Sequence, residues 1–495
     1  MRYVGALDQG TTSSRFMIFD ESGKVVASAQ EEHSQILPQA GWVEHDALEI
    51  WLKVSNVIAA ALKSAGLAGK DLSAIGITNQ RETTVAWDSS TGKPLYNAIV
   101  WQDTRGQVVL DTFNDEQKNL ITHKTGLAIA PYFSGSKISW LLQNVPEVAK
   151  AAESGTLKIG TIDSWLVWNL TKKVHITDVT NASRTLLMNL ETLAWDPELL
   201  NIFGVPEDSL PSIKSSSEIY AHTTSDGIFG AEVPIAGILG DQHAAMVGQL
   251  CFERGDTKCT YGTGNFALVN TGTEIVRSTQ GLLTTVCFKF GDEPARYALE
   301  GSVAVTGSAV QWLRDQLGII HQASEIEALA ASVPDNGGVY FVPAFSGLFA
   351  PYWRSDARGV LVGLTRAATR AHIARATLEA ISYQTKDVID AMASETGVKL
   401  KELRVDGGIT QNNLCMQIQS DILQIALSRP VVSETTALGA AYAAGLAVGV
   451  WPNIDALRNQ WKESARWSPA HGSALATTGY KNWKRAIERT LNWVE

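Results

Sequence analysis

The stretch "DQGTTSSR" (residues 8–15) lies near the start of the chain between two apolar stretches, "YVGAL" (3–7) and "FMIF" (16–19). Two apolar stretches around a short loop predict a β-hairpin, and the turn "DESGK" (20–24) predicts a further strand. We therefore expect an antiparallel meander of two or three strands at the start of the fold. A plain surface turn does not need Thr11, Thr12, Ser13 and Ser14 in a row, so the loop is also a candidate binding site.

Loops rich in Gly, Ser and Thr bind phosphate groups well, because rows of backbone N–H groups and small hydroxyls can approach the anion. This loop has no lysine in a GxxxxGK[ST] arrangement, and the chain lacks the HRD and DFG motifs of protein kinases. Arg15 and a divalent metal near Asp8 would have to supply the positive charge. The alternative is a polar hairpin turn in which Asp8 caps its own backbone.

A weak internal repeat extends this hypothesis. "GTTSSRFMIF" (10–19) has a counterpart in "GTGNFALVN" (262–270), about half the chain later. Two like-built halves could each present one small-residue loop to a shared cleft. The length of 495 residues allows more than one domain, and we place the division after Gly248, giving domains 1–248 and 249–495.

Three other short motifs are candidates for chemistry, each with a structural alternative. In "NQRET" (79–83), Arg81 and Glu82 offer a forked donor and an acceptor for adjacent hydroxyls, although an exposed ion pair explains them as well. In "GDQH" (240–243), Asp241 can accept a proton from an attacking hydroxyl, or can be an ordinary helix N-cap. The "DGG" motif (406–408) at a strand-to-helix junction would allow a nucleotide to approach the backbone, or be a simple helix-start turn.

The bulk composition excludes several classes of protein. A formal net charge of −10 with scattered Lys and Arg argues against nucleic-acid and anionic-membrane surfaces. The four cysteines show no metal-binding spacing and predict buried thiols in a reducing compartment. No secretory signal is apparent, so we expect a cytoplasmic protein. The apolar run "TALGAAYAAGLAVGVW" (436–451) is too short to span a bilayer and predicts a tightly packed internal helix.

Helical spacing elsewhere predicts helices at 49–66, 371–397 and in the amphipathic C-terminal stretch 480–494, while 74–87 predicts strand, loop and strand. The chain is therefore of mixed α/β class.

In sequence order, the motifs together resemble the FGGY family of carbohydrate kinases over essentially the whole chain, and within it the members that phosphorylate glycerol. The resemblance rests on "ALDQGTTSSR", "GWVEHD", "GITNQRETT", "NAIVWQD", "PYFSGSK", "TNASRT", "GDQHAA", "TYGTGNF", "LEGSVAVTG", "FVPAFSGLFAPYW", "RVDGG" and "ETTALGAA". "YFSGSKISWLLQN" and "GVLVGLTRAATRAHIARATLE" also fit the two signatures of the family. The resemblance implies an α/β fold of two ribonuclease-H-like domains of the actin-type ATPase kind, with ATP and substrate in a central cleft.

The resemblance also implies roles for individual residues. Asp8, through water, and Asp241 would hold Mg²⁺, and the transferring phosphates would face Thr11, Thr12, Ser13 and Arg15. The second domain would hold ATP through Thr263, Gly307, Gln311, Gly408 and Asn412. Glycerol hydroxyls would bind Arg81, Glu82, Tyr132, Asp241 and Gln242, with its carbon skeleton against Trp101 and Phe266. Asp241 would be the general base and Arg15 the second catalytic residue.

Departures from the family pattern and open alternatives accompany this hypothesis. The stretch "TTSDGIFGAEVP" (223–234) lacks the arginine of a sugar-bisphosphate loop and contains no histidine, so both known kinds of bacterial control are disfavoured. Asn265, His243 and Arg354 stand where other residues are common. A kinase for another polyol or sugar, and an actin- or chaperone-like ATPase scaffold, stay open as alternatives. The family is usually dimeric or tetrameric, so we expect a homo-oligomer.

Overall fold

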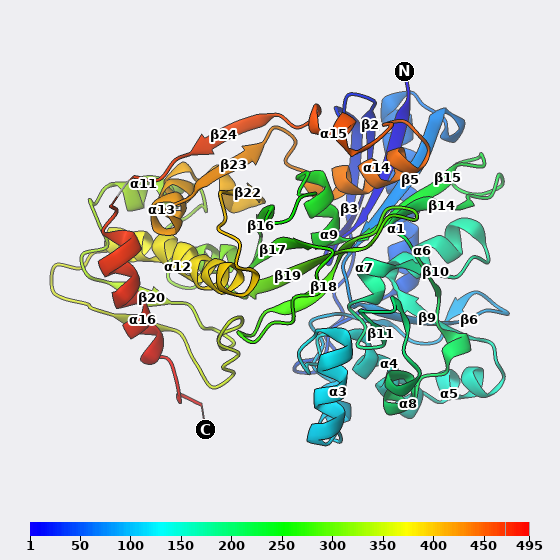
Figure 1. The fold of residues 1–495 in the computed structure, drawn as a ribbon, viewed down its shortest axis with the longest axis horizontal. Coiled ribbons are helices and arrows are strands. Elements are labelled where there is room, and N and C mark those ends of the chain that lie inside the picture. Colours follow the sequence, from blue (N-terminus) through cyan, green and yellow to red (C-terminus); the bar gives the residue numbers. More distant parts are fainter. Residues whose placement is uncertain (471, 495) are drawn as a thin grey trace.

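The computed structural model describes residues 1–470 and 472–494 and is built around two large β-sheets, one in each half of the molecule (Figure 1). The first sheet has six strands in the spatial order β14 (Ser217–His222), β15 (Pro234–Gly240), β5 (Leu72–Asn79), β1 (Tyr3–Gln9), β2 (Ser13–Asp20) and β3 (Val25–Glu32). β1, β2 and β3 pair antiparallel, which confirms the predicted meander. β1 also pairs in parallel with β5, and β5 with β15.

The second sheet repeats this arrangement. Its seven strands follow the order β18 (Leu283–Phe288), β19 (Arg296–Val303), β17 (Asn265–Gly272), β16 (Thr257–Tyr261), β22 (Glu402–Asp406), β23 (Ala426–Pro430) and β24 (Glu463–Trp467). β16 pairs antiparallel with β17 and in parallel with β22, as β1 does with β2 and β5. The two repeated Gly-Thr loops therefore occupy equivalent hairpin turns, between β1 and β2 and between β16 and β17.

Smaller strands extend the first half. A five-stranded sheet contains β4 (Glu44–His45), β8 (Ala98–Ile99), β6 (Thr84–Asp88), β7 (Lys93–Pro94) and β9 (Leu157–Thr161). Three two-stranded pairs complete the strand inventory: β10 (Ile176–Asp178) with β13 (Ser212–Lys214), β11 (Met188–Asn189) with β12 (Ala194–Trp195), and β20 (Tyr340–Val342) with β21 (Val360–Val362).

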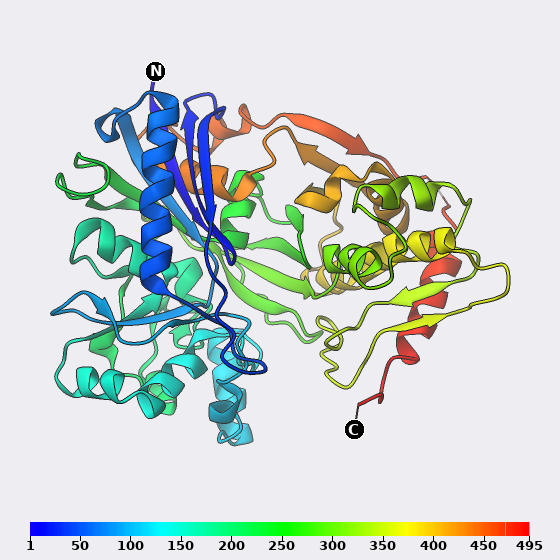
Figure 2. The same cartoon turned by 180° about the vertical axis from the view of Figure 1, so that it is seen from behind.

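Two helices cover opposite faces of the first sheet. α1 (Ala47–Ala65) packs on β2 and β3 and lies in front of the sheet in Figure 2, and α14 (Thr435–Ala447) packs on β5, β15 and β1 and lies in front in Figure 1. α1 begins after the Asp46 side chain, which accepts hydrogen bonds from the Leu48 and Glu49 N–H groups, and ends at Gly66 in the left-handed conformation. The structure thus confirms the helix predicted at 49–66, and local capping residues define its two ends.

α14 also packs closely against α9 (Asp241–Gly248), because glycines face the contact. A Cβ atom at Gly439 would collide with the carbonyl of Ala244, and one at Gly248 with the carbonyl of Thr435. The small-residue stretch predicted to form an internal helix does so. Although α14 comes late in the sequence, its buried residues belong to the same hydrophobic cluster as Phe19, Leu239 and other residues of the first sheet.

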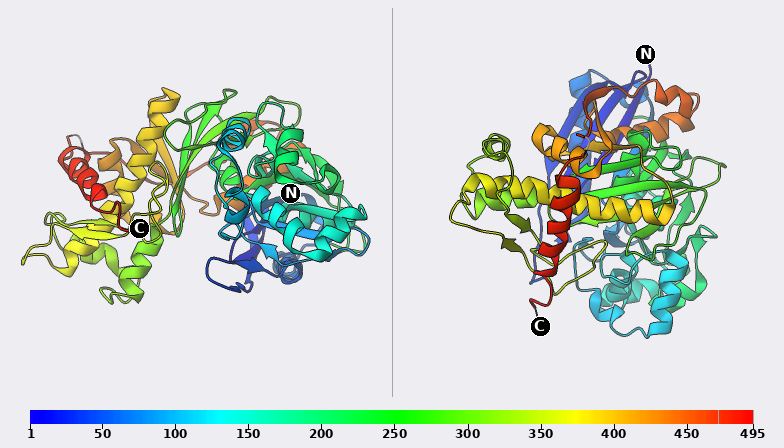
Figure 3. Two further views of the ribbon diagram at one scale, coloured as in Figure 1. Left: turned by 90° about the horizontal axis from the view of Figure 1, so that it is seen from below. Right: turned by 60° about the vertical axis from the view of Figure 1, so that its left-hand side comes forward.

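The remaining helices surround the two sheets (Figure 3). In the second half, the buried face of α12 (Arg370–Thr396) packs against β17 and β19, and the C-terminal helix α16 (Tyr480–Glu488) contacts it. The others are α2 (Gln107–Leu110), α3 (Asp115–Thr125), α4 (Ser134–Asn144), α5 (Pro146–Glu153), α6 (Ile162–Thr171), α7 (Val179–Ala182), α8 (Pro197–Phe203), α10 (Gly307–Asp315), α11 (Glu325–Ala331), α13 (Asn413–Leu423) and α15 (Ile454–Arg458).

All strands of the first sheet precede residue 248 and all strands of the second follow it, while α14 crosses back. The predicted α/β architecture of two like-built halves is confirmed, and the division after Gly248 stays a prediction. The four cysteines are buried and unpaired. Within residues 1–470 and 472–494, no helix has both the length and the apolar character needed to cross a membrane.

Candidate functional site

The first loop, between β1 and β2, is held in place by its neighbours rather than by its own side chains alone. The Gly10 N–H donates to the Ser13 carbonyl at 2.9 Å, and the Thr12 carbonyl accepts from the His33 N–H at 3.1 Å. The Thr11 carbonyl accepts from Gln35 Nε2 at 3.0 Å. These contacts fix the backbone carbonyls of Thr11, Thr12 and Ser13, so the hydroxyls of the loop are not needed to hold them.

Asp8 and Arg15 lie opposite each other at the base of this hairpin. The Arg15 guanidinium pairs with Glu434, immediately before α14, and its Nη2 donates to Gln30 Oε1 at 2.8 Å. Burial raises the pKa of Asp8 to about 6, with Arg15 opposing the shift and the charge of Asp241 adding to it. A carboxyl that is buried near a second carboxylate favours binding of a cation.

The residues predicted to bind glycerol are called the polyol-binding group here: Arg81, Glu82, Trp101, Tyr132, Asp241, Gln242 and Phe266. Arg81 lies at its centre and is buried, so the alternative that Arg81 and Glu82 form an exposed ion pair is wrong. Its Nε lies 3.0 Å from Asp241 Oδ1. Its two terminal nitrogens donate to the carboxylate of Glu300 at 2.5 and 3.0 Å. The guanidinium therefore fixes one predicted site residue, Asp241, while its own position is set by Glu300 on β19.

Glu82 is buried beside Arg81, with φ of 62°, a left-handed conformation that is costly for a residue with a side chain. Its carboxylate accepts from Arg184 Nε at 2.7 Å. Burial raises the pKa of Glu82, although Arg81 and Arg184 oppose the shift. Arg184 and Glu300 were not among the residues predicted for the site. The signal was available, because a single Glu inside the apolar stretch "YALEGSVAV" must have a buried partner.

Trp101 connects two parts of the predicted site, Tyr132 and the loop between β1 and β2. Its Nε1 donates to Thr11 Oγ1 at 2.9 Å, and its ring lies edge-on to Tyr132 with a centroid distance of 5.3 Å. The loop that carries Tyr132 is fixed by the buried Lys137, whose Nζ donates to the carbonyls of Pro131 and Tyr132 at 2.7 and 2.6 Å. Two rigid aromatic rings thus stand beside the hydroxyl-rich turn.

Asp241 and Gln242 open α9 directly after β15. Asp241 is the first residue of the helix and Gly240 precedes it, so the N-cap interpretation of Asp241 is wrong. Its carboxylate accepts from the Gln242 N–H at 2.7 Å, and about a third of the side chain is exposed, at 34%. Asp241 is therefore fixed at the start of the helix and is partly open to a ligand.

Gln242 and Phe266 connect this group to the second sheet. Gln242 Oε1 accepts from the fully buried Lys258, whose Nζ also donates to Thr260 Oγ1 at 3.0 Å. Phe266 lies opposite Thr260 in the β16 and β17 pair. Both predicted residues thus lie along one path of contacts between the halves.

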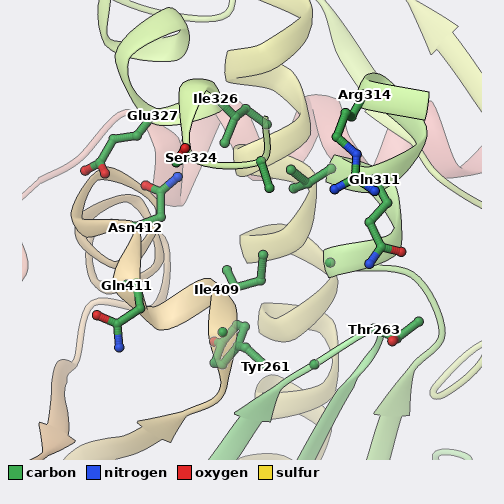
Figure 4. Close-up of a pocket in the computed structure, with 15 residues that line it drawn as sticks. Tyr261, Thr263, Gln311, Arg314, Ser324, Ile326, Glu327, Ile409, Gln411 and Asn412 are labelled. Carbon is green, nitrogen blue, oxygen red and sulfur yellow. The ribbon is translucent and has the colours of Figure 1, made fainter. Parts of the chain in front are cut away.

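The residues predicted to hold the nucleotide line a single cavity of about 470 Å³ in the second half. Figure 4 shows Gln311 and Arg314 of α10 on one side and Asn412 on the other, above Thr263 and Tyr261. The cavity wall includes all five of the predicted residues: Thr263, Gly307, Gln311, Gly408 and Asn412. The structure therefore brings this set together from three separated stretches of sequence.

The "DGG" motif forms one wall of this cavity. Gly407 has φ of 92°, and a Cβ atom there would collide with the backbone of Tyr261. At Gly408, by contrast, a Cβ atom would meet nothing within 4 Å, so the backbone is open on the side of the cavity. Asn412 then caps α13, accepting from the Cys415 N–H at 2.8 Å. The motif combines a helix start with an open approach to the backbone.

Comparison with known proteins agrees with this geometry. The N-terminal domain of the FGGY family of carbohydrate kinases matches residues 3–248, and its C-terminal domain matches residues 257–448. The chain is 61% identical to glycerol kinase 1 of Streptomyces coelicolor, over 100% of this chain and 99% of that protein. It is 60% identical to the glycerol kinase of Mycobacterium tuberculosis, over 100% and 97%.

Among solved structures, glycerol kinase of Plasmodium falciparum with ADP superposes with a TM-score of 0.93 and 42% identity, over 99% of this chain and 98% of that one. The predicted fold, two domains of the actin-type ATPase kind, is confirmed by this match. Matches to both domains of the family and full-length identity near 60% lead to one conclusion: the chain belongs to the FGGY family of carbohydrate kinases.

Proposed function

We propose that this protein transfers the γ-phosphoryl group of ATP to glycerol, giving sn-glycerol 3-phosphate and ADP. The observation that carries the proposal is the setting of Asp241: a partly exposed carboxylate at a helix start, fixed by Arg81 Nε at 3.0 Å and close enough to Asp8 to raise its pKa. The full-length relatives named glycerol kinase support the choice of substrate.

In the proposed reaction, an oxygen of a terminal hydroxyl of glycerol attacks the γ-phosphorus in line. The bond between this phosphorus and the β,γ-bridging oxygen breaks, and ADP leaves. Asp241 accepts the proton of the attacking hydroxyl, and a loose transition state demands positioning more than a strong base. Arg81, Glu82, Tyr132 and Gln242 orient the hydroxyls, while Trp101 and Phe266 confine the carbon chain.

The phosphate groups would lie between the two repeated loops. Thr11, Thr12 and Ser13 offer backbone and hydroxyl donors, and Arg15 adds charge once its guanidinium turns from Glu434 toward the γ-phosphate. Thr263, Gly307, Gln311, Gly408 and Asn412 would hold the nucleoside part in the cavity.

Asp8 and Asp241 fit a magnesium ion. Within the described part of the chain, no group of three His, Cys, Asp or Glu side chains is arranged as a metal site. Mg²⁺ usually binds one or two carboxylates together with substrate phosphates, which matches a pair of acids beside a phosphate loop. When bound, the ion would neutralise developing charge on the phosphates. The raised pKa of Asp8 indicates that its carboxylate has no sufficient cationic partner of its own.

The first experiment measures ADP release from purified protein with Mg²⁺ and ATP, with and without glycerol, and then with erythritol and xylulose. We expect turnover only with glycerol, because Trp101 and Phe266 are proposed to exclude longer carbon chains. Turnover that is independent of any polyol would contradict the proposal and favour an ATPase scaffold.

The second experiment tests Asp241. Asp241→Asn should lower kcat by about 10²- to 10⁴-fold, the range of a lost general base, while the shift in melting temperature with Mg·ADP is retained. Asp226→Asn, at an exposed surface ion pair with Lys172, is the matched control and should leave kcat unchanged. Undiminished turnover in Asp241→Asn would show that this carboxylate is not the base.

We further propose that the two domains, 1–248 and 249–495, close on the substrates, and that the protein is a cytoplasmic homodimer or homotetramer. The oligomeric state rests on the family alone and is tested by light scattering, and the location is tested by cell fractionation.

A further inference from the structure

Two buried residues outside the predicted site connect its charged groups. Glu300 lies in the middle of β19, between β17 and β18, and is 1% exposed. Arg184 follows α7 in the first half and is fully buried. They join Arg81, Glu82 and Asp241 in one cluster of three carboxylates and two guanidinium groups, which we call the charge cluster.

Glu300 is the bridge of the charge cluster. Its Oε2 accepts from Arg81 Nη1 at 2.5 Å, and its Oε1 accepts from Arg81 Nη2 and from Arg184 Nη2, both at 3.0 Å. Burial alone would raise the pKa of Glu300, but Arg184 and Arg81 outweigh burial and hold it well below its usual value. One carboxylate of the second half therefore fixes two arginines of the first.

Each arginine in turn holds one acid of the polyol-binding group. Arg81 uses its Nε for Asp241 at 3.0 Å, and Arg184 uses its Nε for Glu82 at 2.7 Å. Arg184 Nη1 is buried and has no hydrogen-bond partner. The side-chain hydrogen bonds of Arg184 thus go only to the two carboxylates that it bridges, which indicates that these bonds set the position of the guanidinium.

We propose that Glu300 and Arg184 are positioning residues of phosphoryl transfer. Glu300 orients Arg81 toward Asp241, and Arg184 orients Glu82 toward the hydroxyls of the substrate. This inference rests on the proposed function, since it assigns the residues that keep Asp241 and Glu82 aligned for the substrate.

The charges of the two residues predict opposite effects on Glu82. Glu300 raises the pKa of Glu82 and Arg184 lowers it. In Glu300→Gln, the acid limb of the pH profile of kcat/KM for glycerol should therefore move to lower pH. In Arg184→Gln it should move to higher pH. A residue with only a structural role would lower activity evenly across pH.

The kinetic constants give a second readout. Both variants should raise KM for glycerol at least 10-fold and change KM for ATP less than about 3-fold, because the nucleotide cavity is lined by other residues. Arg184→Lys keeps the positive charge but lacks the planar guanidinium group, whose separate N–H donors contact the two carboxylates at once. It should keep the wild-type pH profile and still raise KM for glycerol.

A matched control separates these effects from loss of fold. Glu379 on α12 is equally buried, at 1% exposure, and pairs with Arg375 at 2.9 Å far along the chain from the charge cluster. Glu379→Gln should lower the melting temperature without moving the pH profile or KM for glycerol. An increase in melting temperature on adding Mg·ADP shows that a variant is folded. If Glu300→Gln does not fold, the proposal is tested with the two Arg184 variants alone.

Wild-type activity separates the two proposals. If the wild-type protein does not phosphorylate glycerol, the proposed function fails. If it does, but Glu300→Gln and Arg184→Gln keep the wild-type pH profile and KM for glycerol, or move the profile in the same direction, the positioning role is overturned.

Discussion

At the scale of single residues, Asp8 shows a conflict between stability and function. Its carboxyl is buried next to the first loop, and burial and Asp241 raise its pKa to about 6 from 3.8. An acid whose pKa is higher in the folded than in the unfolded state destabilises the fold when ionised. The penalty is absent below pH 3.8, grows between pH 3.8 and about 6, and is complete above that value.

Asp8→Asn should therefore raise the melting temperature of the ligand-free protein at pH 7.5 and have little effect at pH 3.5. Turnover with Mg·ATP should fall by 10²-fold or more, because the amide carries no charge for the metal. Calorimetry at both pH values, with a kinetic assay, checks this expectation. Equal melting temperatures for the variant and the wild-type protein at pH 7.5 would contradict it.

At the scale of secondary-structure elements, the contact of α9 with α14 sets the position of Asp241, the first residue of α9. Gly248 and Gly439 let the two helix backbones touch, and the same α14 meets β5 at Gly76. Asp241 begins α9, and Glu434 immediately before α14 pairs with Arg15. A shift of either helix would move a predicted catalytic residue.

Gly439→Ala should cost about 3 kcal/mol of unfolding free energy or more, at the upper end of the range for overpacking, because its Cβ collides with backbone rather than with a flexible side chain. This outweighs the gain of roughly 1 kcal/mol expected for Ala over Gly in a helix. Urea unfolding measures the change. The control is Gly204→Ala at the end of α8, where an added Cβ atom would meet nothing within 4 Å. Its only expected cost is the ~1 kcal/mol for placing alanine in a left-handed backbone conformation. A smaller loss for Gly439→Ala than for Gly204→Ala would contradict the packing argument.

At the scale of the whole molecule, the two ligand sites come from different halves. The nucleotide cavity is lined by residues 261–412, whereas Thr11 to Arg15 and Arg81 belong to the first half. Phosphoryl transfer requires both to meet at one phosphorus atom, and exclusion of water prevents wasteful hydrolysis. We therefore expect the halves to move together when both ligands are bound.

Spin labels at Glu116→Cys on α3 and Glu488→Cys on α16 report this motion, because both positions are exposed and the four native cysteines are buried. The distance between the labels should shorten most when Mg·ADP and glycerol are both present. Labelled protein is diluted with unlabelled protein, so that only distances within one chain are measured. An unchanged distance with both ligands bound would show that the halves do not close.

The sequence predicted the features that depend on local signals. The hairpin at 3–20, the equivalent loop at 262–264 and the capped helix α1 follow from turns, caps and periodicity, and the structure confirms them. The cavity residues came from the family resemblance, and the structure brings them together.

Features that depend on distant contacts were missed or misinterpreted. Asp241 looked like a helix cap because its Arg81 partner is 160 positions away in sequence (241 − 81). The burial of Arg81 and Glu82 depends on Glu300 from the other half, and no local pattern connects them. A lone acid in an apolar strand indicates a partner but does not identify it.

The placement of α14 has a consequence for synthesis on the ribosome. This helix covers Met17, Phe19 and Leu239 of the first sheet, yet it emerges only after nearly nine-tenths of the polypeptide has been translated. Until then the nascent N-terminal half exposes an apolar surface that invites aggregation or chaperone capture. The half that is made first can therefore be completed only after most of the second half has been made.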